Sequence, residues 1–226
     1  MYQLYDAIQT QAYTPRWEQA VLADQQFIVT NNQIDPVKLR RFSDLALAKK
    51  APLILDIEAW PVNWQLIHDG LDVALTQTDG QVPVSFYGAG PVGGEIVHQI
   101  CAGNFSAQQE ALAIDLCRDA VAANNRASFL APSLYYAHTT SAEQFFTAAS
   151  YLISACRRQY PGRKIMPFIS PWYSDQLDVH VPMPDWNTLL WTLHGSCDGF
   201  LVWGAPQSVA PNDAWLNAAQ SFAQQT

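Results

Sequence analysis

The chain of 226 residues has few charged residues and no long hydrophobic run. Charged residues make up 14% of it and hydrophobic residues 49%, a composition typical of a packed globule rather than a disordered chain. No apolar stretch is long enough to span a bilayer, so we expect no membrane partner. The N-terminus also lacks the basic region and apolar core of a secretory signal. A secretory signal that had already been removed would also be missing from this sequence, so the compartment is left open. If a signal was removed, we expect an extracytoplasmic location.

Positive charge is scarce as well. The chain has 12 Lys and Arg residues against 20 Asp and Glu residues, which gives a formal net charge of -8. A protein of this charge does not attract nucleic acid over long range, and no local cluster of Lys and Arg offsets the deficit. We therefore expect no nucleic-acid partner, and the same reasoning disfavours a polyanionic substrate. The oligomeric state is left open.

Several motifs of metal, cofactor and serine chemistry are missing. No Cys-x-x-Cys, His-x-His, HExxH or G-x-S-x-G occurs, although His98, His138, His180 and His194 accompany many carboxylates. The glycines that follow SFYG do not have the spacing of a dinucleotide fingerprint. We expect no metal site, no cofactor and no nucleophilic serine. The cysteines are expected to be buried thiols, with one disulfide left open: Cys101, Cys117, Cys156 and Cys197.

Predicted strands alternate with predicted helices along the chain, which favours a parallel α/β barrel. Units of about 30 residues fit seven strands better than eight, so we predict one domain over residues 1–226, a seven-stranded relative of the TIM barrel. The predicted strands are 2–6, 26–30, 53–56, 83–87, 127–138, 164–169 and 199–203. The predicted helices are an amphipathic stretch through 17–22, followed by 36–50, 63–74, 95–102, 107–124, 142–160, 186–194 and 213–224.

The stretch Ala51–Trp64 carries two acids at the end of a predicted strand. Its apolar run is typical of a strand buried on both faces, and Asp56 and Glu58 follow at the carboxyl end. Residues two apart on a strand point to the same side, so both carboxyls are expected to face one pocket. Two neighbouring carboxyls that differ in pKa can act as an acid and a charged partner in bond cleavage. A solvated strand end or an ion pair is the alternative interpretation.

Aromatic residues gather at the same strand ends, where barrels of this type build their pockets. Aromatic rings stack on sugar rings and tyrosine hydroxyls supply directional hydrogen bonds, so this set predicts a carbohydrate site. Trp17, Trp191 and Trp215 lie on predicted helices and are expected in the core. The candidate site residues are Asp6, Asn31, Asp56, Glu58, Trp60, Tyr87, Ser133, Tyr135, Tyr136, Trp172, Tyr173 and Trp203.

Four of these segments resemble, in order, motifs of the hyaluronidase-like glycoside hydrolases, a family with a seven-stranded β/α barrel. DIEAWP at 56–61 is similar to D-W-E-x-W-R-P, and SFYG at 85–88 to the F-Y-G strand. APSLYY at 131–136 is similar to P-S-x-Y, and GFLVWG at 199–204 to I-V-W-G. The resemblance spans roughly residues 26–206, with low identity between the motifs.

The resemblance implies a retaining hydrolase in which Glu58 protonates the leaving oxygen and then acts as base toward water. The nucleophile in that family is the substrate's own 2-acetamido oxygen. Asp56 would orient the acetamido nitrogen, Tyr135 and Tyr87 would hydrogen-bond its oxygen, and Trp203 would pack against its methyl group. Trp60, Ser133, Tyr136, Trp172 and Tyr173 complete the expected substrate-binding set.

The chain departs from the family pattern in ways that change the expected substrate. No arginine stands between Trp60 and Pro61, Ile57 replaces the tryptophan between the acids, and the family's paired cysteines are not evident. A neutral N-acetylated or other polysaccharide is therefore expected rather than hyaluronan. Two other hypotheses remain open: a non-catalytic glycan-binding barrel and a metal-assisted barrel hydrolase.

Overall fold

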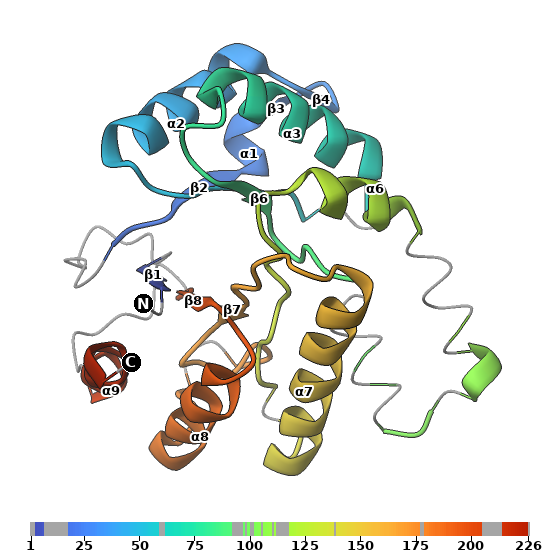
Figure 1. Cartoon of the computed structure of the whole chain (residues 1–226), viewed down its shortest axis with the longest axis vertical. Helices are drawn as coiled ribbons and strands as arrows, with labels where there is room; N and C mark the ends of the chain where they lie inside the picture. The colour runs from blue at the N-terminus through green and yellow to red at the C-terminus, as the bar shows by residue number, and fades with distance from the viewer. Residues whose placement is uncertain are drawn as a thin grey trace.

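Parallel strands occupy the middle of the molecule in the computed structural model, and helices lie outside them (Figure 1). The structure describes residues 3–6, 18–58, 62–91, 97, 99, 102–104, 106–109, 111, 118–137, 139–176, 179–204 and 214–225. One sheet has the order β1-β8-β7 and another the order β2-β5-β6, and a small antiparallel hairpin pairs β3 with β4. The strands are β1 (Gln3–Asp6), β2 (Val21–Asp24), β3 (Val29–Thr30), β4 (Gln33–Ile34), β5 (Leu53–Asp56), β6 (Val84–Phe86), β7 (Phe168–Ile169) and β8 (Gly199–Val202).

The segment 128–134 joins the two parallel sheets, although it forms no regular strand. On one side the Ser128 N–H donates to the Val84 carbonyl at 2.7 Å, and on the other the Leu130 N–H donates to the Lys164 carbonyl at 2.8 Å. Parallel bridges link Leu130 to Ile165 and Ser133 to Phe168. Prolines at 132 and 167 lack the N–H that a continuous ladder needs, which explains why the predicted strands 127–138 and 164–169 are reduced to bridges and a short β7. The seven-strand count therefore stays a prediction.

Helices cover the outside of this sheet on both sides. In Figure 1, α2, α3 and α6 lie at one end of the long axis, and α7 and α8 lie at the other. The helices are α1 (Gln25–Ile28), α2 (Pro36–Lys49), α3 (Trp64–Thr78), α6 (Arg118–Arg126), α7 (Ala142–Gln159), α8 (Met183–His194) and α9 (Ala214–Gln225).

Local capping signals set several helix boundaries. Asp35 caps α2 by accepting from the backbone N–H groups of Val37 and Lys38, and Pro36 occupies the first turn as predicted. Ser141 and Gln144 form the predicted capping box at the start of α7.

The prediction for the second strand was wrong. Residues 26–30 were predicted as this strand, and 17–22 as an amphipathic helical stretch. It is instead Val21–Asp24 that forms a strand and pairs with β5, and the helical turn α1 follows at once. The Asp24 side chain caps this turn by accepting from the Gln26 N–H at 2.8 Å. The strand therefore ends at Asp24 instead of in the β3–β4 hairpin.

Two clusters of buried side chains form the core. The N-terminal cluster packs α2 and α3 against β2, β5 and β6, and the C-terminal cluster packs α7, α8 and α9 against the outward side of β7 and β8. Trp215 is buried there as predicted, but Trp191 is 51% exposed, so its prediction as a core residue was wrong. It lies on α8 with its ring edge against Phe222, and only part of the ring is covered. Trp17 lies outside the described residues.

Buried thiols were predicted for all four cysteines, and two of these side chains fall within the described residues. Cys156 and Cys197 are free and buried, as expected. Cys101 and Cys117 lie outside the described ranges.

Candidate active site

Strand alternation sorts the side chains of β5 and its neighbours into an outward set and an inward set. Leu55 and Ile57 face α3, because a Cβ placed on Gly70 of that helix would lie 2.9 Å from Leu55 Cδ1 and 3.5 Å from Ile57 Cδ1. Asp56 and Glu58 therefore lie on the opposite, inward side, as their spacing predicted.

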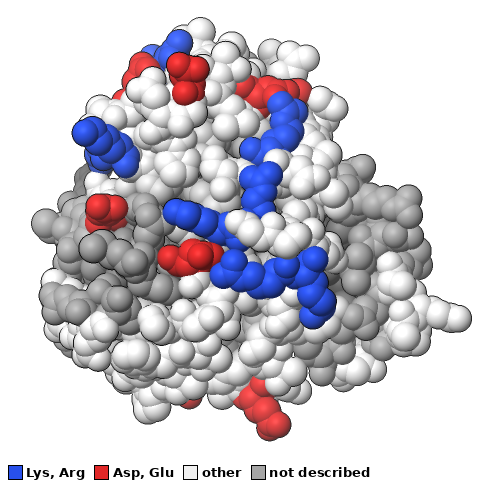
Figure 2. All heavy atoms as spheres, viewed as in Figure 1, with Lys and Arg blue, Asp and Glu red and all other residues white. Residues whose placement is uncertain are grey.

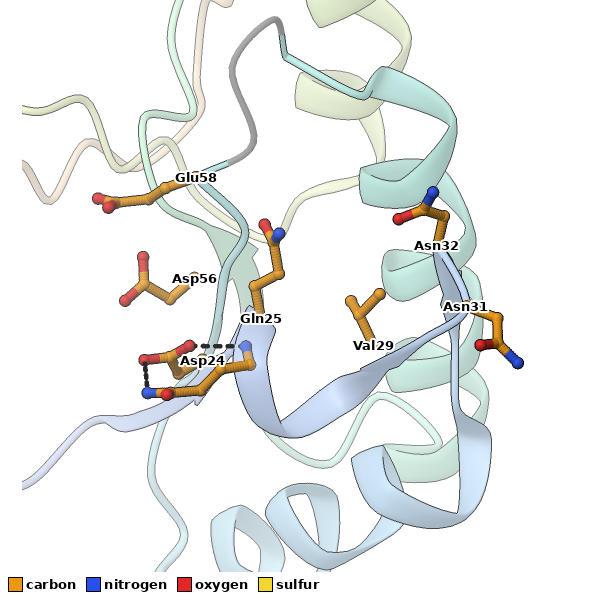
Figure 3. A pocket seen from close by; sticks show the side chains of 8 residues that line it. Asp24, Gln25, Val29, Asn31, Asn32, Asp56 and Glu58 are labelled. Atoms are coloured by element: carbon orange, nitrogen blue, oxygen red, sulfur yellow. Dashed lines mark hydrogen bonds between the residues drawn. The ribbon is translucent and has the colours of Figure 1, made fainter.

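Both acids line an open pocket of about 540 Å³ at the carboxyl ends of β2 and β5. Figure 3 shows the three carboxyl groups of Asp24, Asp56 and Glu58 on one side of this pocket and the β3–β4 hairpin on the other. The two residues at the hairpin tip, Asn31 and Asn32, have φ of 53° and 58°, the left-handed conformation that a two-residue hairpin loop requires. The pocket is lined by Asp24, Gln25, Gln26, Val29, Asn31, Asn32, Asp56 and Glu58.

Asp24 is a site residue that sequence reasoning missed. The parallel register pairs it directly with Asp56, so the ends of two adjacent strands each contribute an acid. A signal for it exists in the sequence, because the apolar run before Asp24 matches the apolar run Leu53–Leu55 before Asp56. The misplaced second strand hid this match.

The environment raises the pKa of both predicted catalytic carboxyls. Burial, followed by the charges of Glu58 and Asp24, raises the pKa of Asp56 from 3.8 to about 7. Burial and the charge of Asp24 also raise the pKa of Glu58. Asp56 is the less exposed of the two, and Glu58 is open to solvent at the pocket. Such a pair can hold a proton at mildly acidic to neutral pH, as acid catalysis requires.

An aromatic wall, formed by Tyr87, Tyr135 and Trp203, stands beside these carboxyls. The Tyr135 ring lies between the other two, with its centroid 6.0 Å from that of Tyr87 and 5.5 Å from that of Trp203. The Tyr87 hydroxyl donates to Ser133 Oγ at 3.0 Å. These four predicted site residues are part-buried and lie at the ends of β6, the segment 128–134 and β8, and the ring contacts and the hydrogen bond bring them together.

The charges of the two carboxyls contribute to a raised pKa of both tyrosine hydroxyls. Burial raises the pKa of Tyr87 to about 12, and the charges of Glu58 and Asp56 also raise it. Burial raises the pKa of Tyr135 well above its ordinary value, again with contributions from Asp56 and Glu58. Both groups therefore stay protonated at neutral pH and can donate hydrogen bonds to a ligand.

The structure does not bring Tyr136, Trp172 and Tyr173 into this site. Tyr136 has the opposite strand parity to Tyr135, so its ring points outward and stacks on Phe145 of α7 with a centroid distance of 4.5 Å. Trp172 is 1% exposed and packs against Trp215, and Tyr173 packs edge-on against Tyr136. We therefore assign these three side chains to the C-terminal cluster and remove them from the candidate site.

Other predicted site residues cannot be placed in full. Trp60 lies outside the described residues, as do His98 and His138. For Asp6 only the backbone is described, and it pairs with Val202 at the end of β1. Within the described ranges, no group of three His, Cys, Asp or Glu side chains could hold a metal ion. None of the described helices is both long and apolar enough to cross a bilayer.

No family model matches the chain, and no protein of curated function does either. Among solved structures, the monoclinic crystal structure of bee venom hyaluronidase superposes with a TM-score of 0.63 at 14% identity, over 97% of this chain and 84% of that one. The complex of bee venom hyaluronidase with a hyaluronic acid tetramer gives a TM-score of 0.59 at 14% identity, over 84% and 74% of the two chains.

This chain shares its fold with a hyaluronidase. The likeness confirms the TIM-like fold and the distant hyaluronidase-like resemblance that four short motifs indicated. At 14% identity it shows the fold alone.

Proposed function

We propose that this chain is a glycoside hydrolase in which Glu58 is the general acid and base. The observation that carries the proposal is the inward placement of Asp56 and Glu58, both with raised pKa, beside the aromatic wall. A protonated carboxyl can donate to a glycosidic oxygen, and aromatic faces can hold the sugar ring during that step. The hyaluronidase fold is compatible with this assignment and with a carbohydrate substrate, because one neighbour holds a hyaluronic acid tetramer.

Glu58 is assigned the acid role because it is the more accessible of the two carboxyls. It extends from the end of β5 into the pocket, whereas Asp56 lies deeper on the strand (Figure 3). In the proposed reaction Glu58 gives its proton to the leaving oxygen and then takes a proton from the attacking water. The microscopic steps are those of a retaining enzyme.

The nucleophile in this proposal is the acetamido oxygen of the substrate. Asp56 orients the acetamido nitrogen, and the hydroxyls of Tyr135 and Tyr87 hydrogen-bond its oxygen as it attacks. The Trp203 ring packs against the acetamido methyl. Support comes from the electrostatic influence of Asp56 and Glu58 on Tyr87 and Tyr135 and from the Trp203 ring beside that of Tyr135, which gives one wall both apolar and hydrogen-bonding parts.

The substrate class follows from the charge of the pocket. Its described lining contains three carboxyl groups and no Lys, Arg or His, so a uronic acid would meet like charges. We propose a polysaccharide or oligosaccharide of neutral N-acetylhexosamine, cleaved by one domain that spans residues 1–226 and completes a seven-stranded barrel.

The experiment is hydrolysis of a panel of aryl glycosides and polysaccharides, with and without a 2-acetamido group. Wild type should cleave only acetamido sugars, and Glu58→Gln should lower kcat by about 10³-fold, the size of a lost general acid. Glu143→Gln is the matched control, because this exposed glutamate lies in the first turn of α7. Circular dichroism should show that both variants fold.

Other results would redirect the proposal. Cleavage of sugars without the acetamido group keeps the hydrolase and discards the acetamido nucleophile. Activity lost on chelation points to a metal-assisted hydrolase instead. Glycan binding without cleavage by wild type favours a non-catalytic glycan-binding barrel, and full activity in Glu58→Gln contradicts the assignment of Glu58.

A further inference from the structure

Asp24 is a third carboxyl beside the proposed catalytic pair. In the parallel register it is the direct partner of Asp56, and adjacent strands lie only about 4.8 Å apart. Its side chain shares the inward parity of Asp56 and Glu58 and lines the same pocket (Figure 3). Neither the family motifs nor the predicted strand pattern assigned it a role.

Two hydrogen bonds from a single residue hold the Asp24 carboxyl in place. The Gln26 backbone N–H donates to Oδ1 at 2.8 Å, and Gln26 Nε2 donates to Oδ2 at 2.8 Å. Both oxygens are thus acceptors, which is the pattern of an ionised carboxylate. Because Gln26 belongs to the helical turn α1 that Asp24 itself caps, the charge is tied to the end of β2.

The groups that face Asp56 and Glu58 from the described elements are acidic or phenolic. Asp24 faces them from β2, Tyr87 from the end of β6, and Tyr135 from the segment after Ser133. The described pocket lining contains no cation that would offset Asp24. A fixed negative charge here favours the protonated form of its neighbours.

The described pocket also contains an unsatisfied acceptor. Gln25 Oε1 is buried and has no hydrogen-bond partner among the described residues, and Gln25 lines the same pocket as Glu58. A buried acceptor without a donor costs free energy, so this oxygen favours a ligand that brings one. The end of β2 and the start of α1 therefore present acceptors to the same space as the catalytic pair.

We propose that Asp24 is a positioning residue of the hydrolase, whose anchored carboxylate keeps a proton on the Asp56–Glu58 pair. The inference rests on the proposed function, because it assigns Asp24 a task in that reaction. Asp24 does not donate a proton itself. It acts through Glu58 and Asp56 by extending the pH range over which the acid stays protonated.

The test compares wild type with Asp24→Asn, which removes the charge but keeps a side-chain oxygen that can cap α1. The readout is the pH dependence of kcat/KM, whose alkaline limb reports loss of the catalytic proton. That limb should move about 0.5 to 1 pH unit lower in Asp24→Asn, the size expected when a nearby like charge is removed. Asp24→Glu should keep the limb near its wild-type position.

Asp35→Asn is the matched control, because Asp35 also caps a helix through two backbone N–H groups but does not line the pocket. Its pH profile should equal that of wild type. An alkaline limb that stays in place in Asp24→Asn overturns the proposal, and so does an equal loss of activity at every pH, since a merely structural role predicts that result.

A second readout separates this proposal from the proposed function. Carbon-13 NMR titration of the carboxyl groups follows Asp56 and Glu58 without any substrate. If wild type cleaves no sugar but the titration midpoints fall in Asp24→Asn, the hydrolase assignment fails and the role of Asp24 in holding the proton stands. Unchanged midpoints overturn the role of Asp24 whether or not wild type is active.

Discussion

Carboxylates have opposite surroundings at the two ends of the parallel strands. At the amino ends, the Asp198 Oδ2 lies 3.0 Å from Nη2 of Arg157 and also accepts from the Ile165 N–H at 2.8 Å. At the carboxyl ends, Asp24, Asp56 and Glu58 lie close together without a cation among the described residues. The same sheet therefore carries a paired carboxylate at one end and an unpaired group of three at the other.

Arginines at the amino ends also bind backbone carbonyls. Arg157 donates to the Ser196 carbonyl at 2.9 Å, and Arg163 donates to the carbonyls of Ala127 and Asn125. These contacts connect the starts of neighbouring strand segments. Figure 2 shows that Lys and Arg side chains form a band across the face seen there, although the chain as a whole is acidic.

This difference separates stability from the proposed chemistry. A paired carboxylate stabilises the fold modestly, whereas an ionised carboxyl that is part-buried among like charges costs stability. Catalytic acids need that unfavourable environment, because it holds the proton near neutral pH. The contrast predicts that substitutions at the two ends change the free energy of unfolding with opposite signs.

The largest effect is expected at Asp56. Its folded-state pKa of about 7 lies above the unfolded value, so the stability it contributes is complete below about pH 4 and is lost as pH rises through 7. The difference between a pKa of 3.8 and one of about 7 corresponds to a free energy of about 4 kcal/mol. Because Asp56 is partly exposed, we expect about 2 to 4 kcal/mol of this to be observed. Asp56→Asn should therefore be more stable than wild type at pH 9 by that amount.

Urea unfolding at pH 4 and pH 9 measures this difference. The two proteins should be nearly equally stable at pH 4, where Asp56 is protonated and resembles asparagine in charge. Subtracting one curve from the other cancels the titration of distant groups. A variant that is less stable than wild type at pH 9, or equally stable at both pH values, would contradict the raised pKa of Asp56.

The positions of Asp56 and Glu58 could be predicted because strand parity is a local property. An apolar run, a strand end and a two-residue spacing were enough to place both acids in one pocket. The same parity argument was available for Tyr135 and Tyr136, yet both were predicted as site residues. Only one face of that segment can look inward, and the structure shows that the other face packs on α7.

The position of Asp24 could not be obtained from local pattern alone. The stretch 26–30 contains β-branched residues that favour a strand, but the Asp24 side chain stabilises a helical turn at 25–28 instead. Which apolar run pairs with β5 is decided by contacts between segments far apart in the chain. The burial of Trp172 could not be predicted from local pattern for the same reason, because its partner Trp215 lies 43 positions later in the sequence.

A cation placed at the carboxyl ends of the strands should reduce the difference between the two strand ends. Gln25→Lys puts an ammonium group into the pocket that the three carboxyls line, so it should favour their ionised forms and lower the pKa of Asp56. We expect a gain of about 1 to 2 kcal/mol in stability at pH 8 and a drop of about tenfold in activity at that pH. Thermal unfolding and kcat/KM measure the two effects.

Gln159→Lys is the control for added charge. Gln159 is exposed at the end of α7, close in sequence to Arg157 and Arg158, and it does not line the pocket of the three carboxyls. It should leave activity unchanged and stability within about 0.5 kcal/mol. If both lysine variants behave alike, net charge rather than the local group of carboxyls governs stability.

The smallest effect is expected at the amino ends, where Asp198→Asn should destabilise the fold by about 1 kcal/mol at pH 7. Asparagine can still accept from the Ile165 N–H, so the loss is limited to the charge shared with Arg157. Asp44→Asn is the matched control, because its pair with Arg40 is longer, at 3.8 Å, and more exposed. Urea unfolding in low and high salt should show a salt-sensitive loss for Asp198→Asn and almost none for Asp44→Asn. A gain in stability from Asp198→Asn would mean that its pairing does not offset desolvation, and the two ends of the strands would then differ only in degree.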